Sequence, residues 1–225
     1  MSKKPVIDLE MYLIRHGESR GNVRTSSEGF DKKELADPGL TEKGLFQADA
    51  LGRYLKDIQF DGVFASGLGR AVETATGILR YKEEGKPLEI LPHLTEVGLR
   101  ADYTGATLQE LREINKNVVM AQDIDPESFT VMPSDSANGG ELYSRAQSVI
   151  DYFRKRYNKG ERIAVVSHAA FITYIVFHIM GFTEDPAFDI NFFNTGVTKI
   201  KFYKEGTNRY GDVVFDYLNN TEHLA

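Results

Sequence analysis

Three groups of polar residues in this chain of 225 residues could bind and transfer a phosphoryl group. Arg15 and His16 form the first group, Arg70 the second and His168 the third. The planar guanidinium of an arginine can bind two phosphoryl oxygens at once. An unprotonated imidazole nitrogen can attack phosphorus. The sequence contains no cysteine, which excludes cysteine nucleophiles, thiolate zinc sites and disulfide scaffolds. We therefore expect catalysis by histidine, acid or hydroxyl groups.

His16 is the candidate nucleophile. It precedes Gly17 in a turn, where the ring can project into a pocket and the backbone can approach a ligand closely. A carbonyl acceptor such as that of Gly17 would fix the tautomer of the ring. Because the sequence has no metal-binding motif, we expect Arg15, Arg70 and a protonated His168 to neutralise the phosphoryl charge. The prediction includes no metal and no cofactor.

Each of these groups follows a predicted buried strand. The apolar runs 11–14, 63–65 and 163–166 precede Arg15, the helix that carries Arg70, and His168, respectively. Strands that alternate with helices predict an α/β fold: a three-layer sandwich with a mainly parallel central sheet and helices on both faces. The carboxyl ends of parallel strands lie at one edge of a sheet. We therefore expect the three groups to converge there.

The remaining pattern extends this architecture. Helical periodicity predicts helices over 41–58, 68–81, 141–157 and 169–182, and further strands are predicted over 88–94, 197–203 and 213–218. Residues 23–39 are rich in Ser, Gly, Asp and Lys, which predicts a mobile surface loop. Residues 96–138 are irregular, with one short helix near 108–114. We interpret them as a cap-like insertion in a single domain that spans residues 1–225.

Composition restricts the partners. The chain has 27 basic and 33 acidic residues and a formal net charge of −6, which disfavours a broad nucleic-acid face or a polybasic membrane patch. The longest apolar stretch, 169–182, is shorter than the ~18 residues of a membrane span. Residues 1–10 lack the apolar run of a signal peptide. We expect a cytoplasmic protein that acts on a small phosphorylated substrate, with no nucleic-acid or membrane partner. The sequence leaves the oligomeric state open.

Several motifs, in order, resemble a known signature. They are Arg15-His16-Gly17-Glu18-Ser19 with Asn22, Ser66-x-Leu68-x-Arg70-Ala71-x-x-Thr74-Ala75, and Ser167-His168, supported by Leu40-Thr41, Leu94-x-Glu96, Gly139-Gly140-Glu141 and Asn194-Thr195. Together they resemble the histidine phosphatase superfamily (branch 1), which has the phosphoglycerate mutase-like fold. The resemblance extends from about residue 11 to about residue 200.

The resemblance implies roles for individual residues. His16 would be the phosphorylated nucleophile, and Arg15, Arg70 and His168 would hold the phosphoryl oxygens. Glu96 would donate a proton to the leaving group and then act as base for the incoming water. Among the residues expected to bind substrate are Asn22, which would add a hydrogen bond, Gly17, Ser19 and Ala169.

The departures from the family pattern bear on the reaction. Ala169 stands where the family often has glycine after the histidine, which adds one methyl group near the pocket. Residues 96–138 contain no Glu-Arg-His-Tyr-type run, which in the cofactor-dependent mutases binds the phosphoglycerate carboxylate. This absence favours a phosphatase that hydrolyses phosphate monoesters of a small metabolite through a phosphohistidine. The alternatives are a cofactor-dependent phosphoglycerate mutase and a non-catalytic sensor of phosphorylated ligands.

Some of these residues also have structural alternatives. Glu18 and Glu141 compete with Glu96 for the role of the acid, and Glu141 would equally stabilise a helix N-terminus. Asn22 and Ser66 would equally shape turns.

Overall fold

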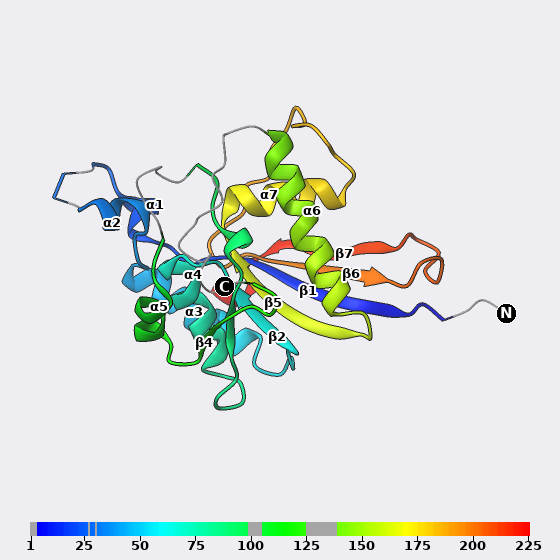
Figure 1. Ribbon diagram of the computed structural model, residues 1–225, viewed down its shortest axis with the longest axis horizontal. Helices are drawn as coiled ribbons and strands as arrows, with labels where there is room; N and C mark the ends of the chain where they lie inside the picture. The colour runs from blue at the N-terminus through cyan, green and yellow to red at the C-terminus, as the bar shows by residue number, and fades with distance from the viewer. Residues whose placement is uncertain (1–3, 27, 30, 99–104, 125–138) are drawn as a thin grey trace.

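The computed structural model describes residues 4–26, 28–29, 31–98, 105–124 and 139–225 (Figure 1). Within these residues the sheet has seven strands in the order β4-β3-β2-β5-β1-β6-β7. The strands are β1 (Ile7–Arg15), β2 (Gly62–Ala65), β3 (Leu88–Ile90), β4 (Val118–Met120), β5 (Glu161–Ser167), β6 (Val197–Tyr203) and β7 (Val213–Asn220). The helices are α1 (Arg20–Val23), α2 (Lys32–Ala36), α3 (Glu42–Tyr54), α4 (Gly69–Leu79), α5 (Leu108–Ile114), α6 (Gly139–Arg156) and α7 (Ala169–Ile179).

The sheet is parallel from β4 to β1 and antiparallel at its other end. β1 pairs in parallel with β5, so that Arg15 lies opposite Ser167. On its other side β1 pairs antiparallel with β6, and β6 pairs antiparallel with β7. The carboxyl ends of β1, β2 and β5 therefore lie at the same edge of the sheet.

Helices cover both faces of the sheet, which is why its inner strands consist of nearly continuous apolar residues. On one face, Leu13 of β1 belongs to a buried cluster with residues of α6 and α7. On the other face, Ile14 belongs to a buried cluster with residues of α3, α4 and α5. Figure 1 shows α6 and α7 on the opposite side of the sheet from α3 and α4. The predicted three-layer α/β fold is confirmed.

Helices α1 and α2 and strand β4 were not predicted. Helix α2 lies inside the segment 23–39, for which the composition predicts a mobile surface loop. Its N-cap is Asp31, whose side chain accepts a hydrogen bond from the backbone nitrogen of Glu34. Strand β4 lies inside the segment 96–138 and pairs in parallel with β3. It has only three residues, too few to show a period.

Two other expectations concern the segment 96–138 and the membrane. The short helix predicted near 108–114 is confirmed as α5. Residues 99–104 and 125–138 lie outside the described residues, so the cap-like insertion stays a prediction. Among the described helices, none combines the length and the apolar character needed to cross a bilayer.

Candidate active site

His16, Arg70 and His168 lie together at the carboxyl edge of the sheet. The ring centroids of His16 and His168 are 5.1 Å apart. Arg70, in the first turn of α4, donates from Nε to Nε2 of His16 at 3.3 Å. All three side chains are buried. The predicted convergence is confirmed, because β1, β2 and β5 end side by side and each continues into one of these residues or its helix.

The His16 ring is held in one tautomer. Nδ1 lies 2.7 Å from the carbonyl oxygen of Gly17. A carbonyl oxygen can only accept, so Nδ1 carries the proton and Nε2 keeps its lone pair. Burial lowers the pKa of His16 well below its usual value, and the positive charge of Arg70 lowers it further. The ring is therefore neutral at pH 7, with a nucleophilic nitrogen facing Arg70.

The turn that carries His16 is fixed through its backbone on both sides. The amide of His16 donates to the carbonyl of Ser167 at 3.0 Å, and the amide of Arg15 donates to the carbonyl of Gly196 at 3.3 Å. The amide of Thr195 returns a hydrogen bond to the carbonyl of Arg15 at 3.0 Å. Neighbouring strands therefore hold the nucleophile in place.

Gly17 allows this turn to pack against α3. A Cβ atom at Gly17 would lie 2.7 Å from the carbonyl oxygen of Gly44, and a Cβ at Gly44 would lie still closer to the carbonyl of Glu18. Neither position accepts a side chain without a backbone shift. The amide of Gly17 donates to the hydroxyl of Thr74 at 3.0 Å. Gly17, expected to bind substrate, thus uses its amide and its carbonyl within the protein.

His168 has a defined tautomer as well. Its Nε2 lies 2.7 Å from the hydroxyl of Ser66, and the same hydroxyl oxygen accepts a hydrogen bond from the amide of Leu68. The buried hydroxyl proton needs an acceptor, and Nε2 is the acceptor that the described residues provide. Nδ1 of His168 therefore carries the proton, and this buried atom has no hydrogen-bond partner among the described residues.

The expected positive charge on His168 is corrected by the structure. Burial lowers the pKa of His168 well below its usual value, and the charges of Arg70, His16, Arg145 and Arg15 lower it further. The imidazole is therefore neutral in the unliganded protein. The neutral ring can donate a hydrogen bond from Nδ1–H to a phosphoryl oxygen. A positively charged His168 ring would require a bound phosphoryl anion.

Arg15 lies beside the two histidines. Its Nη1 donates to the carbonyl of Phe192 at 2.6 Å. Its buried Nε has no hydrogen-bond partner among the residues that the structure describes. Burial lowers the pKa of Arg15, and the nearby carboxylate of Glu96 opposes this effect. Glu96 is thus close enough to the guanidinium to interact electrostatically.

Glu96 lies where the first turn of α7 begins. Its Oε1 accepts hydrogen bonds from the amide of Val97 at 2.9 Å and from the amide of Phe171 at 3.2 Å. The side chain is half-buried. The structure therefore places the expected proton donor near Arg15 and in hydrogen-bond contact with Phe171, which lies two residues after Ala169, the first residue of α7.

Ser19 and Asn22 support the same turn. Oδ1 of Asn22 accepts from the amide of Ser19 and from the side-chain nitrogen of Asn194, each at 3.1 Å. Asn194 also donates to the carbonyl of His16 at 3.1 Å. Ser19 is buried and Asn22 is exposed. With Oδ1 engaged by the protein, Asn22 has its amide NH₂ group to offer to a substrate.

Two charged residues of this region were missed. Asp37, in the segment interpreted as a loop, pairs with Arg70 at 3.2 Å and accepts from the amide of Gly69 at 2.8 Å. Arg145 of α6 is buried, with its guanidinium carbon 3.9 Å from the centre of the Phe171 ring. Arg145 follows Leu142 by three residues on the apolar stripe of its helix. A positively charged residue among the apolar positions of a helix was the signal in the sequence that could have identified Arg145. No comparable signal in the sequence marks Asp37.

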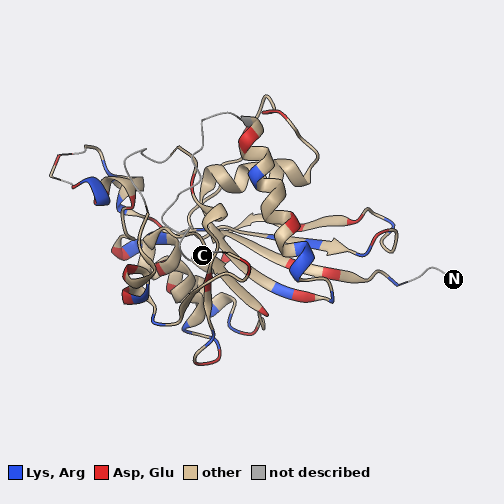
Figure 2. Cartoon of the chain, in the orientation of Figure 1, with Lys and Arg blue, Asp and Glu red and all other residues tan. Residues whose placement is uncertain are grey.

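The positive cluster is local. Figure 2 shows Lys and Arg interspersed with Asp and Glu along the described chain, which has a formal net charge of −6. In the described ranges, no group of three or more His, Cys, Asp or Glu side chains is placed to hold a metal ion. The charged groups next to His16 are guanidinium groups, and such groups suit a phosphoryl group.

Comparison with known proteins gives a consistent result. The family model described as histidine phosphatase superfamily (branch 1) matches residues 11–211. A 2,3-bisphosphoglycerate-dependent phosphoglycerate mutase of Methylobacterium sp. (strain 4-46) is 31% identical over 219 residues, which cover 92% of this chain and 97% of that protein. A broad-specificity phosphatase of Saccharomyces cerevisiae is 26% identical over 221 residues, which cover 96% of this chain and 88% of the yeast protein.

Solved structures show the same fold. The crystal structure of a phosphoserine phosphatase mutant from Entamoeba histolytica, in complex with phosphoserine, superposes with a TM-score of 0.64 and is 26% identical. The match covers 96% of this chain and 100% of that one. Named relatives thus include both phosphatases and mutases, and the solved relative binds a small phosphorylated molecule.

Proposed function

Because this chain belongs to the histidine phosphatase superfamily (branch 1), we propose that it hydrolyses phosphate monoesters of a small metabolite through a phosphohistidine at His16. The proposal requires neither a metal ion nor a cofactor. It assigns nucleophilic attack to His16, charge stabilisation to Arg15, Arg70 and His168, and proton transfer to Glu96.

The observation that carries the proposal is the set of polar atoms around Nε2 of His16. This nitrogen keeps its lone pair because Nδ1 donates to Gly17. Arg70 Nε lies 3.3 Å from it. The buried Arg15 Nε and His168 Nδ1 have no hydrogen-bond partner in the described part of the chain. A phosphoryl group would supply oxygen acceptors for such donors, whose desolvation otherwise costs free energy.

In the first step, Nε2 of His16 attacks phosphorus and forms the N–P bond. The bond from phosphorus to the ester oxygen breaks, and its electron pair stays on that oxygen. Glu96 transfers its proton to this oxygen, so an alcohol leaves instead of an alkoxide. Arg15, Arg70 and Nδ1–H of His168 stabilise the equatorial oxygens, whose charge changes in the transition state.

In the second step, Glu96, now a carboxylate, takes a proton from water. The water oxygen attacks phosphorus and the N–P bond breaks, which returns the electron pair to Nε2 of His16. Inorganic phosphate leaves, and the enzyme regains its starting state. The Gly17 carbonyl holds the ring through both steps, so the tautomer needs no rearrangement.

Phosphoglycerate mutation is the second candidate, supported by the mutase that is 31% identical across 97% of its length. A mutase shares the phosphohistidine but returns the phosphoryl group to a second oxygen of the bound intermediate. Against it stands the lack of a Glu-Arg-His-Tyr-type run in residues 96–138. A sensor without catalysis has no need of a buried imidazole with a fixed tautomer.

Substitution of the nucleophile tests the proposal. His16→Ala should lower hydrolysis of an aryl phosphate by about 10⁴-fold or more, because no phosphoenzyme can form. Wild-type protein that is mixed with ³²P-labelled substrate and then rapidly denatured without acid should carry the label on His16. A circular dichroism melt, with His16→Asn as a second variant, checks that the fold is retained.

Two results would overturn the assignment. Near wild-type activity in His16→Ala would remove His16 as nucleophile. A requirement for a bisphosphoglycerate primer, with mutase turnover faster than hydrolysis, would favour the second candidate.

A further inference from the structure

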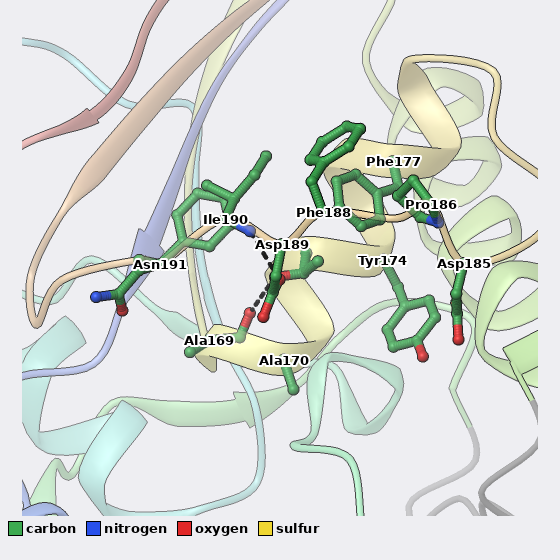
Figure 3. A pocket seen from close by; sticks show the side chains of 12 residues that line it. Ala169, Ala170, Tyr174, Phe177, Asp185, Pro186, Phe188, Asp189, Ile190 and Asn191 are labelled. Atoms are coloured by element: carbon green, nitrogen blue, oxygen red, sulfur yellow. Dashed lines mark hydrogen bonds between the residues drawn. The ribbon is translucent and has the colours of Figure 1, made fainter.

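A groove runs along α7 (Figure 3), from Ala169, which directly follows His168 in the sequence, to Phe177. It encloses about 560 Å³ between α7 and the segment 185–192. Ala169 and Phe192 line one end, and Phe177 and Phe188 line the other. From residue 169 to residue 177 the helix advances roughly 12 Å. The groove is therefore large enough for an organic group of one or two rings.

The groove shares two walls with the phosphate site. Ala169 follows His168 directly, and the carbonyl of Phe192 accepts the 2.6 Å hydrogen bond from Arg15. The same first turn of α7 holds Glu96 through the amide of Phe171. A leaving group protonated by Glu96 would start from the first turn of α7, where Ala169 and Ala170 line the groove.

The far part of the groove is aromatic. The rings of Phe177 and Phe188 contact each other edge to face, with centroids 5.4 Å apart. Phe177 is buried, whereas Phe188 is 55% exposed at the rim. Tyr174 adds a third ring to the same wall. Such ring faces and edges favour flat apolar groups, and their half-exposed surface would lose water on binding.

Two carboxylates lie on the rim of the groove. Burial raises the pKa of Tyr174, and the negative charges of Asp185 and Asp189 raise it further. Neither aspartate forms an ion pair with Lys or Arg in the described residues. Their charge repels an anion that enters the groove.

We infer that the groove along α7 binds the organic part of the substrate, and that this part is apolar, with at least one aromatic ring and no second phosphate or carboxylate. The inference rests on the proposed function, since the groove is defined as the leaving-group side of that site. It narrows the substrate class to phosphate monoesters of apolar alcohols. It also disfavours phosphoglycerates, which carry a carboxylate.

The test compares esters with leaving groups of similar basicity. Wild-type protein should hydrolyse 3-phenylpropyl phosphate with a kcat/KM about tenfold or more above that for propyl phosphate, because only the former reaches the rings. Phe188→Ala should reduce this ratio about threefold or more. Tyr210→Ala is the matched control, since Tyr210 is 73% exposed and lies between β6 and β7; it should leave the ratio unchanged.

The charge of the rim has its own test. The double variant Asp185→Asn with Asp189→Asn should raise kcat/KM for 3-phosphoglycerate about threefold at low salt, with a smaller effect in about 1 M salt because exposed charges are screened. The same variant should leave the ratio of phenylpropyl to propyl phosphate within about twofold, because its rings are intact.

The outcomes separate the two proposals. Equal wild-type kcat/KM for the phenylpropyl and propyl esters, or equal losses on both esters in Phe188→Ala, would overturn the groove assignment and leave the phosphatase assignment standing. If the wild type hydrolyses neither of the two esters and also fails to hydrolyse an aryl phosphate, both proposals are overturned. A wild-type preference for 3-phosphoglycerate over phenylpropyl phosphate would overturn the assigned substrate class.

Discussion

The proposed phosphate-binding cluster and the groove along α7 lie next to each other but are built differently. The cluster consists of Arg15, His16, Arg70 and His168. The cluster stands on the ends of three adjacent strands, and its two imidazoles have hydrogen bonds that fix their tautomers. The groove lies between one helix and an irregular segment, with an exposed ring and two exposed acids at its rim. The cluster is fitted to one chemical group, whereas the groove can change with little effect on the sheet. We therefore expect substitutions in the cluster to change the rate for every ester and substitutions in the groove to change selectivity.

Glu96 contacts the first turn of α7, and Glu96→Gln should have the largest effect of the remaining predictions. Without an acid, hydrolysis of propyl phosphate should slow by about 10³-fold, because an alkoxide would have to leave without a proton. p-Nitrophenyl phosphate has a good leaving group, so its first step should lose less than about tenfold. Stopped-flow release of nitrophenol should then show a burst, because the second step still lacks its base.

Equal losses on both esters, without a burst, would contradict the role of Glu96 as acid. Glu18→Gln is a matched control, since the Glu18 carboxylate pairs with Lys43 and accepts a hydrogen bond from the hydroxyl of Thr41. Its effect on either ester should stay within about threefold.

Substitution of Asp37 tests whether activity depends on the orientation of Arg70 as well as on its charge. Asp37→Asn keeps the shape but removes the carboxylate that holds Arg70 at 3.2 Å. Arg70 would then be less well fixed against Nε2 of His16, and kcat should fall about tenfold. Inorganic phosphate should inhibit at least as strongly as in the wild type, because Arg70 loses a neutralising partner.

Asp49→Asn is the control for this substitution, because Asp49 forms its ion pairs with Arg53 and Arg80 on exposed helix surface. A parallel loss of kcat and of phosphate inhibition in Asp37→Asn would indicate that the site has collapsed, and would refute the positioning role.

The smallest expected effect concerns stability and acid. The pKa values of His16 and His168 lie well below the usual value in the folded protein, mainly because of burial. The unfolded chain therefore takes up protons first as the pH falls below about 6.5, which lowers the free energy of unfolding. At pH 5.5 the loss is about 1 kcal/mol for each of the two histidines.

Urea titrations at pH 7.5 and pH 5.5 measure this effect. His16 and His168 together lower the free energy of unfolding between pH 7.5 and pH 5.5. His168→Gln should remove about half of this decrease. A wild type that gains stability on acidification to pH 5.5 would contradict the neutral state of these rings.

Prediction from the sequence succeeded where the local apolar pattern and the geometry of a parallel sheet lead to the same arrangement. Runs such as 11–14 and 163–166 are apolar and end in charged or polar residues, so the strands and the convergence of Arg15, Arg70 and His168 follow from parallel-sheet geometry. The Gly17 carbonyl as acceptor for His16 was also predicted from the turn, and is confirmed at 2.7 Å.

The remaining features depend on contacts between residues distant in the sequence. Asp37 shows no periodicity, and its partner Arg70 lies 33 residues away. The neutral state of His168 depends on burial and on surrounding guanidinium groups, which composition does not reveal. The groove exists because residues 185–192 lie along α7, and the sequence of an irregular segment does not specify its path.

The backbone pairing on both sides of the His16 turn has a kinetic consequence. The amides of Arg15, His16 and Thr195 donate hydrogen bonds that connect the end of β1 to the end of β5 and to the segment just before β6. Such hydrogens exchange with deuterium through opening of the sheet, because local fraying of a loop does not release them. We therefore expect these three amides to be among the slowest to exchange, and the backbone that carries the imidazole to stay in place over many catalytic cycles.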